Sequence, residues 1–95
     1  MDIREKSRQA SEIATSFDEY RYTMDLLGIK VRIEDKNISY MYPGRDKAKR
    51  GKTLGKQYDK DGLMEKFKDN DLRFAVDPMT RKILEEKLSY HPSLN

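Results

Sequence analysis

Positions 44–55, which read GRDKAKRGKTLG, hold the residue types and spacings that come nearest to a site for chemistry. Their centre, Gly51-Lys52-Thr53, looks like the end of a phosphate-binding loop, in which backbone N–H groups surround one phosphate and the lysine folds over it. That loop has about four residues between its two glycines, whereas six separate Gly44 from Gly51 here. A phosphate-binding loop also follows a buried parallel strand and opens a helix, whereas this stretch follows an amphipathic hairpin and runs into Leu54-Gly55. We therefore expect no bound nucleotide.

The same stretch holds most of the positive charge of the chain. Between Gly44 and Lys60 there are seven lysines and arginines against two aspartates, a net charge of +5, so the rest of the chain carries −2 of the total of +3. Cations on a projecting loop each displace a condensed counterion from a phosphate backbone, and a nearby tyrosine can stack on an unpaired base. The residues that we expect to bind nucleic acid are Arg45, Lys47, Lys49, Arg50, Lys52 and Lys56.

Two plainer interpretations of this stretch stay open. A run of charges is often only a solvated loop, and the neighbouring Tyr40, Tyr42 and Tyr58 can equally form a half-buried core face. Arg50 could fix the loop instead of binding a partner, by pairing with Asp59 or by packing on Tyr58.

Catalytic chemistry has little support in this sequence. The single histidine, His91, stands beside a proline near the C-terminus, and one histidine cannot form a histidine cluster. There is no cysteine for a thiolate metal site or a thiol nucleophile. Adjacent carboxylates such as Glu85-Glu86 are expected at solvated helix positions and not in the apolar setting that acid–base catalysis needs. We expect no catalytic residue, no metal and no cofactor, and we expect that the chain is not an enzyme.

The sequence also bears on the compartment. No apolar run approaches the ~18 residues that span a bilayer, and the N-terminal MDIREKSRQA is too charged for a signal peptide. The lack of cysteine suits a reducing compartment. We expect a soluble, cytoplasmic protein that does not bind membranes.

Helical periodicity predicts the elements before the basic stretch. A solvated helix is expected from Asp2 to about Ala14, with a narrow apolar stripe. A second helix begins at Ser16, where Ser16-x-x-Glu19 fits a capping box, and ends at Gly28 with a left-handed C-cap. The apolar stripe of the first helix consists of Ile3, Ala10, Ile13 and Ala14.

A hairpin and further helices are expected after Gly28. Alternating apolar residues at 29–33 and 38–42, joined by a turn at 35–37, predict two antiparallel strands, and a short third strand is expected at 50–54. Asp59 can cap a third helix that runs to about Lys68, and Asp77-Pro78 can start a last helix that ends near His91-Pro92. Asp69-Asn70-Asp71 reads as a hinge.

These elements predict one small α+β domain. With 95 residues, 36% apolar and 39% charged, the chain can build one thin core. We expect two N-terminal helices, a two- to three-stranded antiparallel sheet and one or two further helices. We expect residues 1–70 to form the compact unit and residues 71–95 a C-terminal helix that packs loosely or is flexible.

The stretch from Phe17 to Phe67, about half of the chain, resembles a segment of plasmid and conjugative-element relaxases of the mobilization-protein family, C-terminal to their nuclease domain. The resemblance rests on a helix that ends in glycine, then a strand, a turn and a basic loop that closes on R-G-x-x-L-G-x-x-Y. The matching residues are Gly28-Ile29-Lys30-Val31, Ile38-Ser39-Tyr40 and Arg50 to Tyr58.

The resemblance implies a post-catalytic portion of a DNA-nicking enzyme. Relaxases nick a transfer origin with a tyrosine nucleophile and a metal held by a histidine cluster, and this chain has neither the cluster nor an assignable nucleophile. The resemblance implies bacterial transfer-origin DNA as a partner, with Arg50 as the most structured contact because Gly51 lets the backbone approach a phosphate. Leu54, Gly55 and Tyr58 are better explained as determinants of the fold.

Two functions follow as hypotheses. The first is a non-catalytic nucleic-acid-binding module of a relaxase, which contacts transfer-origin DNA through the basic loop. The alternative is a protein-interaction or dimerisation module that docks the relaxase catalytic domain, another protein of the DNA-transfer complex or a second copy, through the stripe of the first helix.

Overall fold

The computed structural model describes residues 3–42, 44–45 and 47–88, and it is α+β as expected. The sheet has the strand order β1-β2-β3, and both of its pairings are antiparallel. The elements are α1 (Ile3–Ser11), α2 (Phe17–Leu26), β1 (Lys30–Ile33), β2 (Ile38–Met41), β3 (Lys49–Arg50), α3 (Gly51–Leu54), the 3-10 turn η1 (Lys56–Tyr58), α4 (Lys60–Val76) and α5 (Pro78–Leu88).

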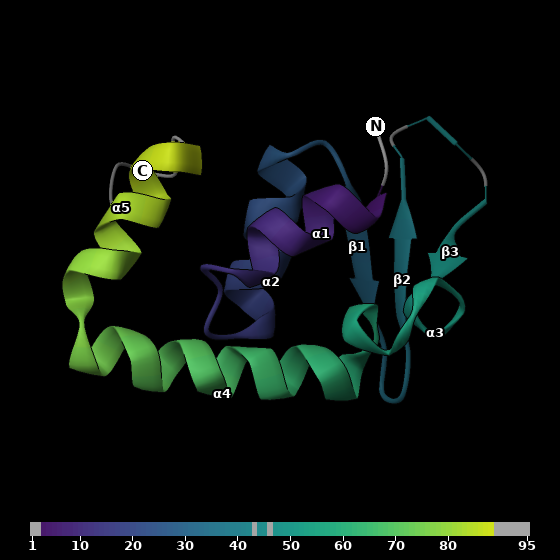
Figure 1. Cartoon of the computed structure of the whole chain (residues 1–95). Helices are drawn as coiled ribbons and strands as arrows, with labels where there is room; N and C mark the ends of the chain where they lie inside the picture. The colour runs from purple at the N-terminus through teal and green to yellow at the C-terminus, as the bar shows by residue number, and fades with distance from the viewer. Residues whose placement is uncertain (1–2, 43, 46, 89–95) are drawn as a thin grey trace.

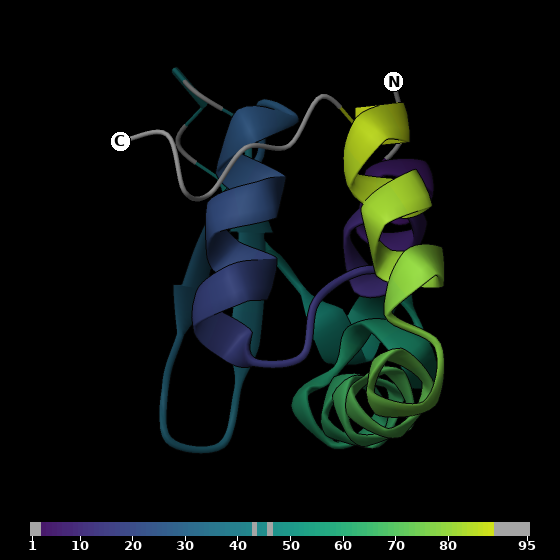
Figure 2. The same ribbon diagram turned by 90° about the vertical axis from the view of Figure 1, so that its left-hand side faces the viewer.

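Helix α4 lies along one side of the molecule, at the bottom of Figure 1, and the other elements lie above it in this view. The sheet rises at one end of α4, α5 rises at the other end, and α1 and α2 lie between them. Seen from the side, the hairpin stands at the left margin and α1, α3, α4 and α5 lie to its right (Figure 2). Helix α2 packs against β1 and α3 against β2 and β3, whereas α5 packs on α4 at the end away from the sheet.

The core forms where α1, α2, the sheet and α4 meet. Tyr20 of α2 and Tyr40 of β2 are fully buried, and Phe67 of α4 packs against Tyr20 with its ring centroid 5.6 Å away. The stripe expected on the first helix belongs to this core, since Ile3, Ala10, Ile13 and Ala14 are all buried. That stripe is therefore not available for docking a partner, which corrects the surface proposed from the sequence.

Both ends of α2 are as predicted. The Ser16 hydroxyl accepts from the Glu19 N–H at 3.2 Å. Gly28 has φ +89°, and the Ile29 N–H reaches back to the Met24 carbonyl at 2.9 Å, which is a Schellman ending. The Glu19 carboxylate, however, accepts from the N–H and hydroxyl of Thr15 rather than from Ser16.

The hairpin is also as predicted, but the third strand is shorter. The N–H of Glu34 donates to the Asn37 carbonyl at 2.8 Å across the expected turn. Only Lys49 and Arg50 join the sheet as β3, and the residues expected to continue it, Gly51–Leu54, form one helical turn instead. The chain turns there because Gly51 packs directly against the backbone of Tyr58, as described below.

The expected hinge at 69–71 lies inside a continuous helix. Helix α4 runs on past Lys68 to Val76. Asn70 is buried inside it, and its side-chain amide donates to the carbonyls of Ser11 and Ala14 at 2.6 and 2.8 Å. The boundary proposed after residue 70 therefore falls within α4. Independent movement of residues 71–95 stays a prediction, and the end expected near His91-Pro92 lies outside the described residues.

Candidate nucleic-acid interface

All six cations expected to bind nucleic acid are exposed: Arg45, Lys47, Lys49, Arg50, Lys52 and Lys56. Within the described part of the chain, none of them forms an ion pair. The seventh cation of the stretch, Lys60, has a structural use, because its ammonium donates to the carbonyls of Glu34 and Asp35 at 2.8 and 2.9 Å. The six side chains are therefore free to meet a polyanion.

Three of these cations surround one hollow. Arg45, Lys47 and Lys49 line a space of about 460 Å³, and its other lining residues are Ile3, Tyr40 and Tyr42. Among the residues that the structure describes, no carboxylate lines it. We call this hollow and its three cations the loop surface.

The sheet register divides the basic stretch between two faces. Lys49 pairs with Tyr40, which faces the core, whereas Arg50 pairs with Ser39. Because successive side chains of a strand point to opposite faces, Lys49 lies on the core side with the loop surface and Arg50 lies on the opposite side. The cations of the basic stretch are therefore divided between two faces of the sheet.

The face that carries Arg50 holds cations that the sequence analysis did not select. Arg32 of β1 pairs with Ser39, so Arg32, Ser39 and Arg50 form one row across the three strands. Lys30 lies on the same face two residues earlier. The strand alternation of residues 29–33 was visible in the sequence, but the pairing of β3 with β2, which brings Arg50 into the same row as Arg32, was not.

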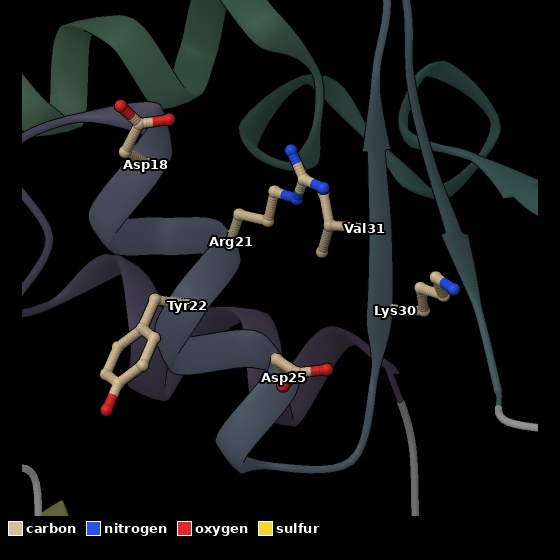
Figure 3. Close-up of a pocket in the computed structure, with 6 residues that line it drawn as sticks. All are labelled: Asp18, Arg21, Tyr22, Asp25, Lys30 and Val31. Carbon is tan, nitrogen blue, oxygen red and sulfur yellow. The ribbon is translucent and has the colours of Figure 1, made fainter. Parts of the chain in front are cut away.

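The hollow between α2 and β1 has mixed charge. It has a volume of about 400 Å³ and is lined by Asp18, Arg21, Tyr22, Asp25, Lys30 and Val31 (Figure 3). In this view Arg21 extends from α2 toward β1, while Asp18 and Asp25 belong to the helix side. Its two carboxylates balance its two cations, so we do not select it as an anion site.

The tyrosines near the basic stretch belong mainly to the core. Tyr40 is 0% and Tyr58 9% exposed, so neither ring can stack on a base, and Tyr42 is half-buried. The Tyr40 hydroxyl donates to the Tyr58 carbonyl at 2.6 Å and lies 2.9 Å from the Tyr20 hydroxyl, which in turn lies 2.5 Å from the Ser7 hydroxyl.

This hydroxyl chain also bears on nucleophilic chemistry. Burial raises the pKa of Tyr20 to about 12 and raises the pKa of Tyr40 further. A phenol that resists deprotonation is a poor nucleophile, so burial here works against activation of either tyrosine.

The motif R-G-x-x-L-G-x-x-Y is explained mostly by packing. A Cβ atom on Gly51 would lie 2.2 Å from the Tyr58 carbonyl oxygen and 2.7 Å from Ile38, and Gly55 has φ +141°. Leu54 and Tyr58 are buried in the core. The role of Gly51 in bringing backbone close to a phosphate therefore has a competing explanation inside the fold.

Arg50 is the exception in that motif. Its side chain is exposed, and no ion pair with Asp59 is present among the described residues. The Asp59 carboxylate instead caps α4 by accepting from the Lys60 N–H at 3.0 Å. Arg50 is thus presented to solvent and is not used to fix the loop through Asp59.

Other chemistry finds no support in the described residues. They contain no group of three or more histidine, cysteine, aspartate or glutamate side chains placed to hold a metal ion, and none of their helices has the length and apolar character of a membrane span. His91 lies outside the described part of the chain.

Comparison with known proteins gives one partial likeness. Over 51 residues, 53% of this chain, the sequence is 47% identical to Protein rlx of Staphylococcus aureus. This chain spans only 16% of that protein. No family model and no solved structure matches the chain. The likeness supports a mobilization-related origin only loosely, and it covers only about half of the chain.

Proposed function

We propose that this chain is a non-catalytic nucleic-acid-binding module of a mobilization protein, which contacts transfer-origin DNA in the bacterial cytoplasm through its basic loop. The observation that carries the proposal is the loop surface, where Arg45, Lys47 and Lys49 line one hollow whose described lining contains no carboxylate. Lys52 and Lys56 are exposed on the adjoining turns and extend the positive charge. The likeness to Protein rlx supports the choice of partner.

Electrostatics decides what such a site can do. Each cation that neutralises a phosphate releases counterions, so the logarithm of the binding constant falls with the logarithm of salt concentration by about 0.9 for each contact to duplex DNA. Contacts of this kind position a protein on the backbone without reading sequence. The loop surface therefore supplies affinity, and sequence selection would rest with another part of the protein.

A salt titration tests the proposal. Binding of the chain to a fluorescent 20-base-pair duplex is measured by anisotropy between 50 and 200 mM KCl. The double variant Lys47→Gln/Lys49→Gln is expected to lower the salt slope by about 1.8, one step of about 0.9 for each lost contact. A matched control is Lys82→Gln/Lys87→Gln, which removes the same charge from exposed positions on α5 at the other end of the molecule. Equal slopes for the two variants would reject the loop surface as the DNA contact.

A second candidate function has one observation in its favour. Four apolar side chains along the end of α4 and the start of α5 are more than half exposed: Leu72 at 68%, Val76 at 87%, Met79 at 59% and Ile83 at 54%. Such a group is typical of a surface that another protein covers. A protein-interaction module would use this surface rather than α1.

Gel filtration with light scattering separates this second candidate. If a second copy covers the surface, the chain is a dimer and Val76→Glu makes it monomeric. A monomeric wild-type chain whose mass does not change with concentration would remove self-association through α4 and α5.

A further inference from the structure

We propose that the open face of the sheet is a second DNA contact, which binds the phosphate backbone of duplex DNA through Arg21, Lys30, Arg32 and Arg50. This inference rests on the proposed function. We call the surface the sheet surface, to distinguish it from the loop surface on the other side.

The register builds the sheet surface. Arg32 pairs with Ser39 and Ser39 pairs with Arg50, so the two guanidinium side chains start from neighbouring positions of one row. Strands lie about 4.8 Å apart, which separates the Cα atoms of Arg32 and Arg50 by roughly 10 Å. One duplex strand carries a charge every ~3.4 Å along the helix axis, so this distance covers about three phosphates.

Two more cations continue the row toward α2. Lys30 stands two residues before Arg32 and therefore on the same face. Arg21 reaches from α2 toward the edge strand β1 (Figure 3). Arg21, Lys30 and Arg32 together line a hollow of about 380 Å³ with Val31, Ile33, Ser39, Met41 and Ala48, and none of these described lining residues is a carboxylate.

These cations have no competing use in the described structure. All four side chains are exposed, and none forms an ion pair with another described residue. Asp18 and Asp25 share the neighbouring hollow between α2 and β1 with Arg21 and Lys30, without forming an ion pair with them among the described residues. The hollow over the strands, lined by Arg21, Lys30 and Arg32, has no carboxylate among its described lining residues.

The composition of the sheet surface selects duplex over single-stranded DNA. Its outward strand residues in the described sheet are Lys30, Arg32, Ser39, Met41 and Arg50. None of them is aromatic, whereas surfaces that hold single strands combine cations with rings on which bases stack. Without such rings the sheet surface can grip phosphates but cannot hold unpaired bases.

Lysine and arginine on an outward strand face have a plainer use, because edge charges keep sheets from pairing with other chains. A direct comparison of variants decides between the two. The sheet variant is Arg21→Gln/Arg32→Gln, the loop variant is Lys47→Gln/Lys49→Gln, and the control is Lys82→Gln/Lys87→Gln. Arg50 is left unchanged in the sheet variant because it is the immediate neighbour of Lys49 in β3. A substitution there would not separate the sheet surface from the loop surface.

Each protein is titrated with a 20-base-pair duplex and with a 20-nucleotide single strand at several KCl concentrations. We expect the sheet variant to bind the duplex roughly tenfold more weakly at 150 mM salt, with a salt slope lower by about 1.8. We expect its affinity for the single strand to change less than for the duplex. The thermal unfolding midpoint of the sheet variant should match that of the wild type, since both side chains are exposed.

The outcomes separate the two proposals. If the loop variant weakens binding and the sheet variant matches the control, the sheet surface is rejected and the proposed function stands. If the sheet variant loses affinity equally for both ligands, the preference for duplex is wrong. If the wild-type chain binds neither ligand, the proposed function and this inference fall together. Should the double variant unfold, Lys30→Gln alone is expected to lower the duplex slope by about 0.9 and replaces it.

Discussion

At the scale of single residues, one carbonyl organises the segment after the basic loop. The Tyr58 carbonyl accepts from the Tyr40 hydroxyl at 2.6 Å and lies against the α-carbon of Gly51. The hydroxyl chain continues through Tyr20 to Ser7, so α1, α2, β2 and the segment after α3 share one buried set of hydrogen bonds. A glycine at 51 is required because any side chain would occupy the space of that carbonyl.

We therefore predict that Gly51→Ala destabilises the chain by about 3 kcal/mol, because a Cβ atom placed 2.2 Å from the Tyr58 oxygen forces the backbone apart. Urea unfolding followed by circular dichroism measures this. Gly44→Ala is the comparison, since Gly44 has φ +79° with open space around it, and its cost should be about 1 kcal/mol. Equal losses for the two variants would contradict the packing role of Gly51.

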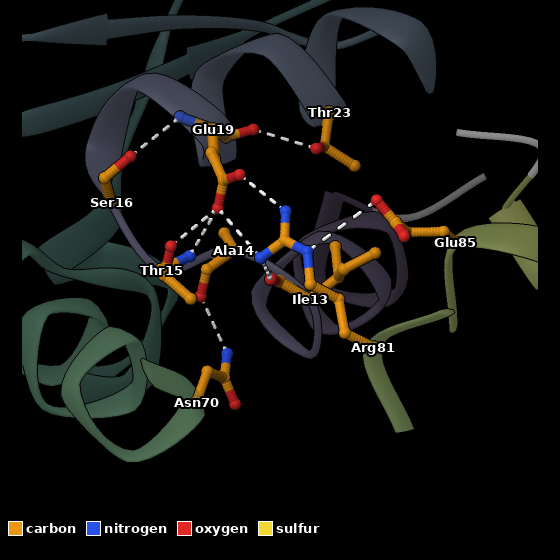
Figure 4. Close-up of polar contacts among 9 residues, drawn as sticks. All are labelled: Ile13, Ala14, Thr15, Ser16, Glu19, Thr23, Asn70, Arg81 and Glu85. Carbon is orange, nitrogen blue, oxygen red and sulfur yellow. Dashed lines mark hydrogen bonds and ion pairs between the residues drawn. The ribbon is translucent and has the colours of Figure 1, made fainter. Parts of the chain in front are cut away.

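At the scale of elements, the end of α1 is held by side chains from α4 and α5. Four successive carbonyls at this end, those of Ser11 to Ala14, accept hydrogen bonds from distant residues. Asn70 donates to the first and the last, Arg73 to Glu12 at 3.0 Å and Arg81 to Ile13 at 3.4 Å, and Figure 4 shows Asn70 and Arg81 in place. Helix ends leave such carbonyls without partners in their own helix, so α4 completes α1.

We predict that Asn70→Ala lowers the free energy of unfolding by roughly 2 kcal/mol, because two carbonyls lose their donor beside buried residues. Asn70→Asp should cost more, since it turns an acceptor toward those carbonyls while keeping the size of the side chain. Asp69→Ala is the neighbouring control on the exposed side of α4. The hinge interpretation predicts the opposite, namely no loss for either Asn70 variant.

At the scale of the whole molecule, α5 is attached by polar contacts more than by its apolar residues. None of its described residues is buried. Arg81 instead pairs with Glu19 of α2 at 2.6 Å and with Glu85 of its own helix at 3.7 Å (Figure 4). The guanidinium carbon of Arg81 also lies over the ring of Phe74, 5.5 Å from the ring centroid. The Glu19–Arg81 pair is therefore a polar link between α5 and the start of α2.

The stabilisation that the Glu19–Arg81 pair contributes should depend on pH. Partial burial raises the pKa of Glu19, but hydrogen bonds from Arg81 and Thr15 lower it more, so its pKa lies below the ordinary 4.5. A carboxyl whose pKa is lowered by folding stabilises the protein above its unfolded-state pKa, and this stabilisation disappears as the pH falls through the folded-state value. We predict that Glu19→Gln, which cannot titrate, loses less stability than wild type between pH 6 and pH 3.

Urea unfolding at the two pH values measures this difference, and hydrogen exchange of the α5 amides shows where it arises. Arg81→Gln should lower stability at pH 6 by about 1–2 kcal/mol and weaken the pH dependence in the same way. Parallel pH profiles for wild type and Glu19→Gln would show that the pair does not hold α5.

Local signals in the sequence were sufficient for the elements whose boundaries depend on near neighbours. Ser16, Gly28 and Asp59 end or begin helices through contacts within a few residues, and the alternation at 29–33 and 38–42 made the hairpin visible. The α+β class and the exposed positions of the basic loop follow from the same short-range patterns.

Tertiary structure decided the rest, because the deciding contacts join residues far apart in the chain. In the sequence, Asn70 resembles a turn residue. In the fold it is buried, and its amide donates to the carbonyls of Ser11 and Ala14, which lie more than fifty positions earlier in the chain. The resemblance gives Gly51 a role in close approach to a phosphate, and only the Tyr58 carbonyl beside it supplies the packing reason for a glycine there. Which of Lys49 and Arg50 faces the core depends on the register between β2 and β3. A shift of one residue would exchange the two faces, and no local pattern in the sequence determines this register.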